Sequence, residues 1–148
     1  MIAQKYIVNV EAAIYKDDKW LLGKRSEHED YEPGVISLIG GKVEIVENKE
    51  LVLENELKRE ILEESGVEIF DEIIYVKSNV FMMNVDTPVL DVVFLCRYKK
   101  GTPTDKDPNE IISFDWHSLE DLKNNKNIKS WTKDSINQAF IKMTELEK

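Results

Sequence analysis

The feature that most constrains this chain is an acidic segment at residues 59–67, with the sequence REILEESGV, which follows the pair Gly40-Gly41. If the segment is helical, at about 100° per residue, four glutamates fall within one sector of about 100°. They are Glu56, Glu60, Glu63 and Glu64. The adjoining sector is apolar and carries Leu53, Leu57 and Ile61. The acidic stripe therefore borders the buried face of the helix, where carboxylates are well placed to hold a metal ion.

Like charges within the stripe weaken the predicted helix. Glu56 and Glu60 lie four residues apart, as do Glu60 and Glu64, and each such pair costs a few tenths of a kcal/mol. We therefore expect something outside the helix to compensate. Composition alone favours an ordinary charged surface helix, because charge runs usually are solvated faces. The spacing of the glycines and glutamates favours the metal site instead.

Size and charge narrow the class of protein. The chain has 148 residues, of which 42% are hydrophobic, so we expect one domain spanning residues 1–148. Its net charge of −9 argues against a protein that holds nucleic acid by its phosphates. Apolar runs stay well short of the about 18 residues needed to span a bilayer, so we expect a cytoplasmic protein without membrane contact. The single cysteine, Cys96, lies in an apolar run and is interpreted as a core residue.

The predicted strands are runs rich in β-branched and apolar residues, bounded by turn residues. They lie at residues 6–15, 20–25, 34–39, 67–76, 80–83, 89–98 and 111–116. The first two form a hairpin with a turn at residues 17–19. A weaker alternation at residues 42–46 indicates a further strand, and Gly40-Gly41 is expected to form a loop that approaches the helix.

The main helix is predicted to begin near Asn48, whose side chain would cap it, and to end at Gly66, which suits an αL conformation. A short helix is predicted to open at Ser118, and a last helix covers residues 130–146. The loops are predicted at residues 27–33, 100–108 and 123–127. Strands on both sides of a helix, without regular alternation, predict an α/β fold in which helices pack on the faces of a mixed sheet.

The acidic segment resembles the box of the Nudix hydrolase (MutT-like) family. That box runs Gly, five residues, Glu, seven residues, Arg-Glu, an aliphatic residue, any residue, Glu-Glu, any residue, Gly, aliphatic. Residues 59–67 match its second half at every specified position, and Gly41 with Glu47 matches its first half. Flanking likenesses at residues 21–25 and 110–122 extend the resemblance over most of the chain.

Two departures from the family pattern stand out. Eleven residues, 48–58, separate Glu47 from Arg59 where the family has seven, so either Glu47 or Glu50 corresponds to the first glutamate of the box. Upstream, relatives commonly carry Trp, any residue, Leu-Pro, whereas residues 36–39 of this chain read ISLI. The second departure weakens a prediction of base stacking there, but not that of a metal site.

The resemblance implies a Nudix fold, an α/β/α sandwich with a mixed β-sheet. It also implies that Glu60, Glu63, Glu64 and the backbone carbonyl of Gly40 bind Mg²⁺, with Mn²⁺ as an alternative, and that one of the carboxylates orders the attacking water. Arg59 is expected to orient a carboxylate, since an Arg–carboxylate pair holds geometry well. Some relatives place a further metal ligand or general base at the position of Glu110, although a solvated loop acid is an equal alternative.

Three residues are candidates for contact with the substrate. Lys24 and Arg25 suit phosphates, but adjacent strand residues point to opposite faces, so at most one of them faces the site. Phe81 lies in the apolar run at residues 80–83, which suits the lining of a pocket and is explained equally well by a hydrophobic strand.

The implied function is Mg²⁺-dependent hydrolysis of a phosphoanhydride bond in a nucleoside diphosphate linked to another moiety. The preferred substrate is a nucleoside triphosphate, giving monophosphate and pyrophosphate. The alternatives are an ADP-ribose or nucleotide-sugar pyrophosphatase, a non-catalytic nucleotide-binding module of the same fold, and a structural domain whose acidic helix is merely a surface. We expect a small nucleotide as the ligand, no stable binding of nucleic acid, and either a monomer or a homodimer.

Overall fold

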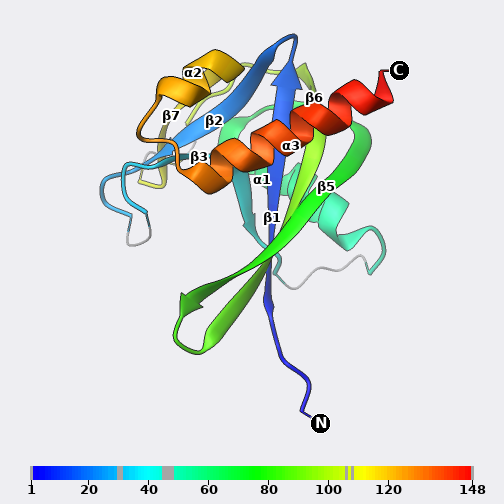
Figure 1. The fold of residues 1–148 in the computed structure, drawn as a ribbon, viewed down its shortest axis with the longest axis vertical. Helices are drawn as coiled ribbons and strands as arrows, with labels where there is room; N and C mark the ends of the chain where they lie inside the picture. The colour runs from blue at the N-terminus through cyan, green and yellow to red at the C-terminus, as the bar shows by residue number, and fades with distance from the viewer. Residues whose placement is uncertain (1, 30–31, 45–48, 106, 108, 148) are drawn as a thin grey trace.

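The computed structural model describes residues 2–29, 32–44, 49–105, 107 and 109–147. Within these residues, seven strands form one mixed sheet (Figure 1). They are β1 (Ile7–Lys16), β2 (Lys19–Arg25), β3 (Ile36–Ser37), β4 (Ile39–Lys42), β5 (Glu68–Asn84), β6 (Thr87–Lys100) and β7 (Ile111–Ser118). The strand order is β3-β2-β1-β6-β5, with β4 paired to β1 and β7 paired to β2. Strand β1 is parallel to β6 and antiparallel to β2 and β4.

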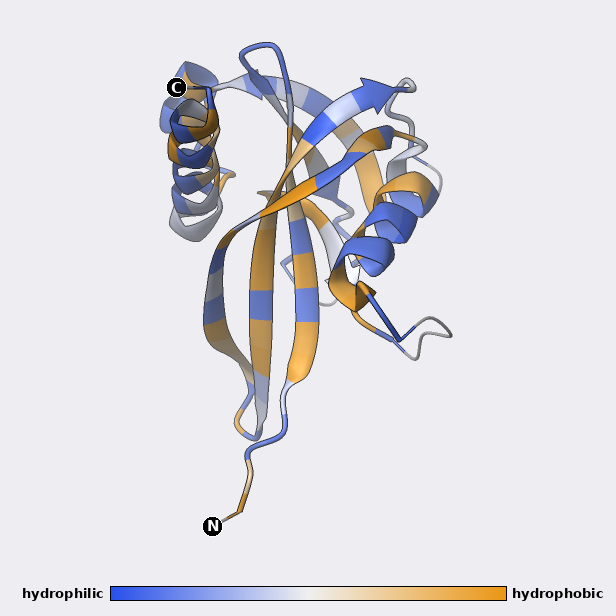
Figure 2. Cartoon of the chain, turned by 90° about the vertical axis from the view of Figure 1, so that its right-hand side faces the viewer, coloured by the Kyte–Doolittle hydropathy of each residue, from blue (hydrophilic) through white to orange (hydrophobic). Residues whose placement is uncertain are grey.

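Helices cover both faces of the sheet. Helix α1 (Val52–Ser65) packs on one face, and α2 (Leu119–Asn124) and α3 (Ser130–Leu146) pack on the other. Figure 2 shows α1 and α3 on opposite sides of the strands. Because side chains alternate along a strand, β1 serves both cores. Val10 and Ala12 face α1, while Ala13 faces α3. This arrangement confirms the predicted α/β/α sandwich.

The helices follow local sequence signals. Gly66 ends α1 in the αL conformation, with a φ of 76°, and its N–H donates to the carbonyl of Leu62. Ser118 caps α2, since its hydroxyl accepts the N–H of Asp121 while the Asp121 carboxylate accepts the N–H of Ser118. Helix α3 has the predicted bounds, and Cys96 is buried in the core beneath α1, as predicted.

The structure corrects several of the predicted elements, and the strand predicted at residues 34–39 is divided between β3 and β4. Residues 67–76 and 80–83 belong to one strand, β5, which pairs with β6 along most of its length through several register shifts. Gly40 and Gly41 lie in β4, not in a loop, because both pair with β1. Helix α1 begins at Val52, later than predicted, while Asn48, the predicted cap, lies outside the described residues. The predicted loop at residues 123–127 begins two residues too early, because α2 extends to Asn124.

Candidate functional site

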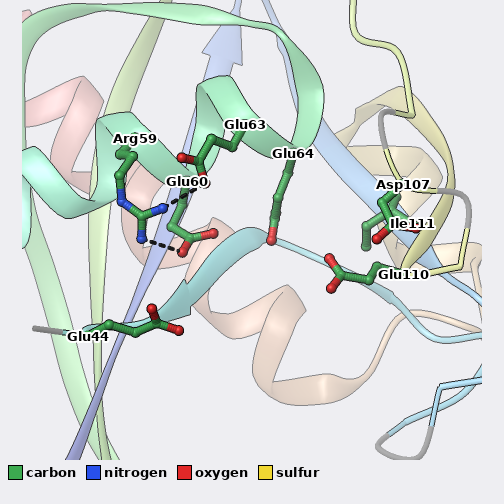
Figure 3. Close-up of a pocket in the computed structure, with 8 residues that line it drawn as sticks. All are labelled: Glu44, Arg59, Glu60, Glu63, Glu64, Asp107, Glu110 and Ile111. Carbon is green, nitrogen blue, oxygen red and sulfur yellow. Dashed lines mark hydrogen bonds and ion pairs between the residues drawn. The ribbon is translucent and has the colours of Figure 1, made fainter.

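A cavity of about 320 Å³ lies between the outer face of α1 and the loop that precedes β7. We call it the acidic pocket (Figure 3), and it is lined by Glu44, Arg59, Glu60, Glu63, Glu64, Asp107, Glu110 and Ile111. Six of these eight residues are carboxylates that come from three separate segments of the chain. The predicted acidic stripe of the helix therefore forms one wall of a real cavity.

Helix α1 is held in place from its apolar side. Leu57 and Ile61 are fully buried against the sheet, and the stripe of glutamates beside them lines the pocket at the edge of that buried face. Near the end of the helix, the Ser65 hydroxyl donates to the carbonyl of Ile61 over 2.6 Å. The positions of Glu60, Glu63 and Glu64 thus follow from the burial of their neighbours along the helix.

Arg59 is the centre of an ion-pair network on α1. Its Nη1 donates to Oε2 of Glu63 over 2.6 Å, and its Nη2 donates to Oε1 of Glu60 over 3.0 Å. Both oxygens of Glu56 also accept hydrogen bonds from this guanidinium, from Nε and Nη2. The hydrogen bonds with Glu56 are the main reason that the pKa of Arg59 is raised. Arg59 therefore contacts three carboxylates, which includes the orienting contact expected from the sequence.

Buried and crowded carboxyl groups meet at Glu60 and Glu64. Burial raises the pKa of the Glu64 carboxyl to about 8, and the charges of Glu60 and Glu110 act in the same direction, against Arg25. The pKa of Glu60 is also raised, chiefly by burial and despite the opposing charge of Arg59. Figure 3 shows both side chains pointing toward the side of the pocket from which Glu44 and Glu110 approach. Such a site stabilises a bound cation, because a cation offsets the cost of clustered carboxylates.

The two glycines of β4 let the strand pack closely against both of its neighbours, strand β1 at Gly40 and helix α1 at Gly41. A Cβ atom on Gly41 would lie 2.8 Å from Cδ of Glu60, and one on Gly40 would lie 2.1 Å from the carbonyl oxygen of Val10. The Gly40-Gly41 pair therefore lets β4 pair with β1 while the Glu60 carboxylate lies over the strand. This contact is tertiary, and no backbone turn is involved.

The donor set fits a hard divalent cation, since Mg²⁺ and Mn²⁺ prefer carboxylate and carbonyl oxygens. Among the described residues, however, no three acidic, histidine or cysteine side chains already converge as ligands. Arg59 holds Glu60 and Glu63, and Glu64 lies farther along the pocket toward Glu110 (Figure 3). Binding of one cation by all three glutamates therefore requires Glu64 to turn toward the two carboxylates that Arg59 holds.

The candidate substrate residues divide between the site and other parts of the fold. Arg25 is close enough to Glu64 to lower its pKa, and it pairs in the sheet with Ile111, which lines the pocket. Neither Lys24 nor Arg25 is among the residues that line the pocket. Phe81 is half-buried on β5 opposite Val89 and lies outside the acidic pocket.

Of the two candidates for the first glutamate of the box, only Glu50 lies within the described residues, and it does not line the pocket. Glu47 lies outside the described residues, and Glu50 is exposed just before α1. The spacing of Glu60, Glu63 and Glu64 within α1 is that of the family's box.

Glu44, Asp107 and Ile111 line the pocket but were not among the residues predicted for the site. The carbonyl of Asp107 accepts the N–H groups of Glu110 and Ile111, each over 3.0 Å, and the resulting turn carries Glu110 toward α1. The only sequence signal for Asp107 was its place in an Asp-containing loop. The sequence pattern places Glu56 in the acidic stripe but predicts no function for it.

Fold and site together place the chain among the α/β/α-sandwich proteins that carry a glutamate-rich box on the helix between β4 and β5. A family model described as a NUDIX domain matches residues 5–139. The chain belongs to the Nudix family. It is a Nudix pyrophosphohydrolase, an enzyme that hydrolyses the pyrophosphate bond of nucleoside diphosphate derivatives. Enzymes of this family bind small nucleotides and generally use divalent metal cations.

Solved structures share the fold over nearly the whole chain. A MutT NUDIX hydrolase from Burkholderia pseudomallei is 26% identical, with a TM-score of 0.76, over 91% of this chain and 98% of that chain. The MutT protein from Methanosarcina mazei Go1 is 24% identical, with a TM-score of 0.75, over 97% and 99%. The NUDIX domain of Shewanella oneidensis NrtR, solved with ADP ribose, is 19% identical, with a TM-score of 0.74, over 95% and 90%.

Two further searches gave negative findings. None of the curated proteins compared with the chain matches it at a significant level. Within the described part of the chain, helices that combine enough length with enough apolar character to cross a membrane are absent.

Proposed function

We propose that this enzyme hydrolyses a nucleoside triphosphate to the monophosphate and pyrophosphate, with Mg²⁺ as the cofactor and Mn²⁺ as a substitute. The observation that carries the proposal is the acidic pocket, in which Glu60 and Glu64 are raised in pKa by burial and face further carboxylates. An acidic pocket repels an acidic substrate unless cations lie between them.

Glu60, Glu63, Glu64 and the carbonyl of Gly40 would hold the cation. When bound, Mg²⁺ neutralises phosphate charge and lowers the pKa of a water molecule enough for attack near neutral pH. Arg25, whose charge acts on Glu64 although it does not line the pocket, would contribute a contact with a phosphate oxygen, and Arg59 would keep Glu60 and Glu63 in a fixed orientation. Phe81 lies apart from the pocket, so its contact with a substrate would require a ligand that extends along the sheet.

Glu110 is our candidate for the general base that accepts a proton from the attacking water. It lies across the pocket from Glu64, close enough for its charge to raise the pKa of that carboxyl (Figure 3). In Glu110→Gln we expect a lower rate and a changed acid limb of the pH–rate profile. If both stay as in the wild type, the base role is wrong.

A second candidate substrate class is ADP-ribose or a nucleotide sugar. The related NrtR domain was solved with ADP ribose, and a UDP-X diphosphatase with 20% identity shares the fold. The acidic pocket suits either class, because both contain the same diphosphate group.

The test is a screen of nucleoside triphosphates, ADP-ribose and nucleotide sugars with Mg²⁺ or Mn²⁺, which detects phosphate released by auxiliary enzymes. We expect Glu64→Gln to lower turnover by about a hundredfold or more, since metal-binding and electrostatic groups at the reacting centre carry effects of that size. Near-normal turnover in a correctly folded Glu64→Gln protein would refute the site. Saturable binding without turnover would instead indicate a binding module.

We also propose that residues 1–148 act as one domain and that the protein is a monomer or a homodimer. One sheet extends from β1 to β7, and both cores pack against it, which supports a single folding unit. Light scattering coupled to size-exclusion chromatography distinguishes the two oligomeric states.

A further inference from the structure

Glu56 is a buried carboxylate directly behind the acidic pocket. Only 2% of its side chain is exposed, and it is not among the residues that line the pocket. A buried charge is costly unless it is paired and hydrogen-bonded. Its partner is Arg59, three residues later on the same helix.

The contact between these two side chains is bidentate. Arg59 Nε donates to one carboxylate oxygen of Glu56 over 3.3 Å, and Nη2 donates to the other. Paired hydrogen bonds of this kind fix the plane of the guanidinium as well as its position. The remaining donors of Arg59 then face Glu60 and Glu63 at the wall of the pocket.

The burial of each carboxylate shows which of these contacts holds Arg59 most firmly. The side chain of Glu63 is 59% exposed and that of Arg59 is 41% exposed, and ion pairs between exposed groups contribute little. Glu56 is the most deeply buried of the three partners, so its contact is the least screened by water. Among the carboxylates that pair with Arg59 in the described part of the chain, Glu56 alone is buried, so its loss would remove the most firmly held contact of the guanidinium.

We propose that Glu56 is a positioning residue, which acts through Arg59 to hold Glu60 and Glu63 ready for a divalent cation. The inference rests on the proposed function, because it concerns carboxylates that would bind the metal. Two effects act in the same direction. Glu56 neutralises Arg59, which lowers its competition with a cation, and it fixes Arg59 between two carboxylates that would otherwise repel each other.

The experiment measures Mn²⁺ binding by electron paramagnetic resonance in the wild type, Glu56→Gln, Glu56→Met and a control, Glu54→Gln. Glu54 lies in the first turn of the same helix and outside the pocket lining. Both variants of Glu56 should fold, because the Arg59 that loses its partner is 41% exposed and stays solvated. Circular dichroism and thermal melting without metal check that the variants fold. If Glu56→Gln fails to fold, Glu56→Met still tests the proposal.

We expect both Glu56 variants to bind Mn²⁺ about tenfold more weakly or worse, which is the usual effect of removing a partner behind a metal ligand. The Mg²⁺ concentration for half-maximal activity should rise, while the rate at saturating Mg²⁺ falls less. Ile61→Val, which weakens the core beneath α1, should lower the melting temperature without changing Mn²⁺ affinity, and so separates positioning from stability.

Unchanged Mn²⁺ affinity in a folded Glu56 variant would overturn the positioning role and leave the proposed function standing. Equal weakening in Glu54→Gln and Glu56→Gln would also overturn it, because the effect would then reflect net charge alone. A wild type that binds no Mn²⁺, or a Glu60→Gln variant that binds it normally, would overturn the proposed function and the role of Glu56 with it.

Discussion

Replacing each glycine of the Gly40-Gly41 pair by alanine should separate activity from stability. The new Cβ at Gly41 would lie 2.8 Å from Cδ of Glu60, whereas ordinary van der Waals contacts begin at 3.4 Å. The Glu60 carboxylate must therefore move by about 0.6 Å. It lies at the far end of a flexible side chain, so the fold tolerates this, and alanine offsets about 0.5–1 kcal/mol of the backbone entropy that glycine loses on folding.

Activity should respond far more strongly than stability. A misplacement of about 1 Å in a catalytic constellation can cost about a hundredfold in rate. For about 0.6 Å we expect Gly41→Ala to lower turnover by about tenfold or more and to weaken Mn²⁺ binding. The free energy of unfolding should change by less than about 1 kcal/mol.

Gly40→Ala is the matched comparison. Its Cβ would lie 2.1 Å from the carbonyl oxygen of Val10 in the neighbouring strand, so a backbone must move instead of a side-chain end. We expect a loss of about 1–3 kcal/mol in the free energy of unfolding, which is typical of overpacking. Urea titration measures stability, and steady-state kinetics with saturating Mg²⁺ measures turnover. If Gly41→Ala keeps full activity, or if it loses as much stability as Gly40→Ala, the reasoning is wrong.

Two further predictions concern stability away from the pocket. Glu11 lies on the sheet face opposite α1. Burial and a hydrogen bond with Asp91 raise its pKa well above 4.5. The free energy of unfolding of the wild type should therefore be highest below pH 4.5 and fall as the pH rises toward the pKa of the folded state. Glu11→Gln should remove this loss, so the difference in melting temperature between the variant and the wild type should grow as the pH rises above 4.5. Parallel profiles of melting temperature against pH would contradict this. Gly66→Ala should cost about 1–2 kcal/mol in urea titration, because its φ of 76° is strained for alanine, and a loss within error would exclude that strain.

Local signals predicted the helices better than the strands. The bounds of α3 and the αL end of α1 follow from periodicity and a glycine, both of which act over a few residues. The sequence predicts two strands where the structure has the single strand β5, because the apolar pattern is interrupted at residues 77–79. Pairing with β6 continues through these residues, and a pattern within one segment does not contain that pairing.

The same limit applies to the acidic pocket. Spacing was sufficient to select Glu60, Glu63 and Glu64, and the resemblance to the family pointed to Glu110. Neither signal shows that Glu56 is buried while Glu63 is exposed, although both were assigned to one stripe. The like charges of the glutamates were expected to be compensated from outside the helix. In the structure Arg59, which lies on the same helix, pairs with three of them.

The sequence by itself determined that a helix ends at Gly66 with a ridge of glutamates beside an apolar stripe, because helical periodicity is a local property. The tertiary structure alone decided what faces that ridge. Pairing of β4 with β1 brings Gly41 against Glu60, and the loop before β7 brings Asp107 and Glu110 across the pocket. These distances depend on contacts between residues far apart in the chain, which no local pattern specifies.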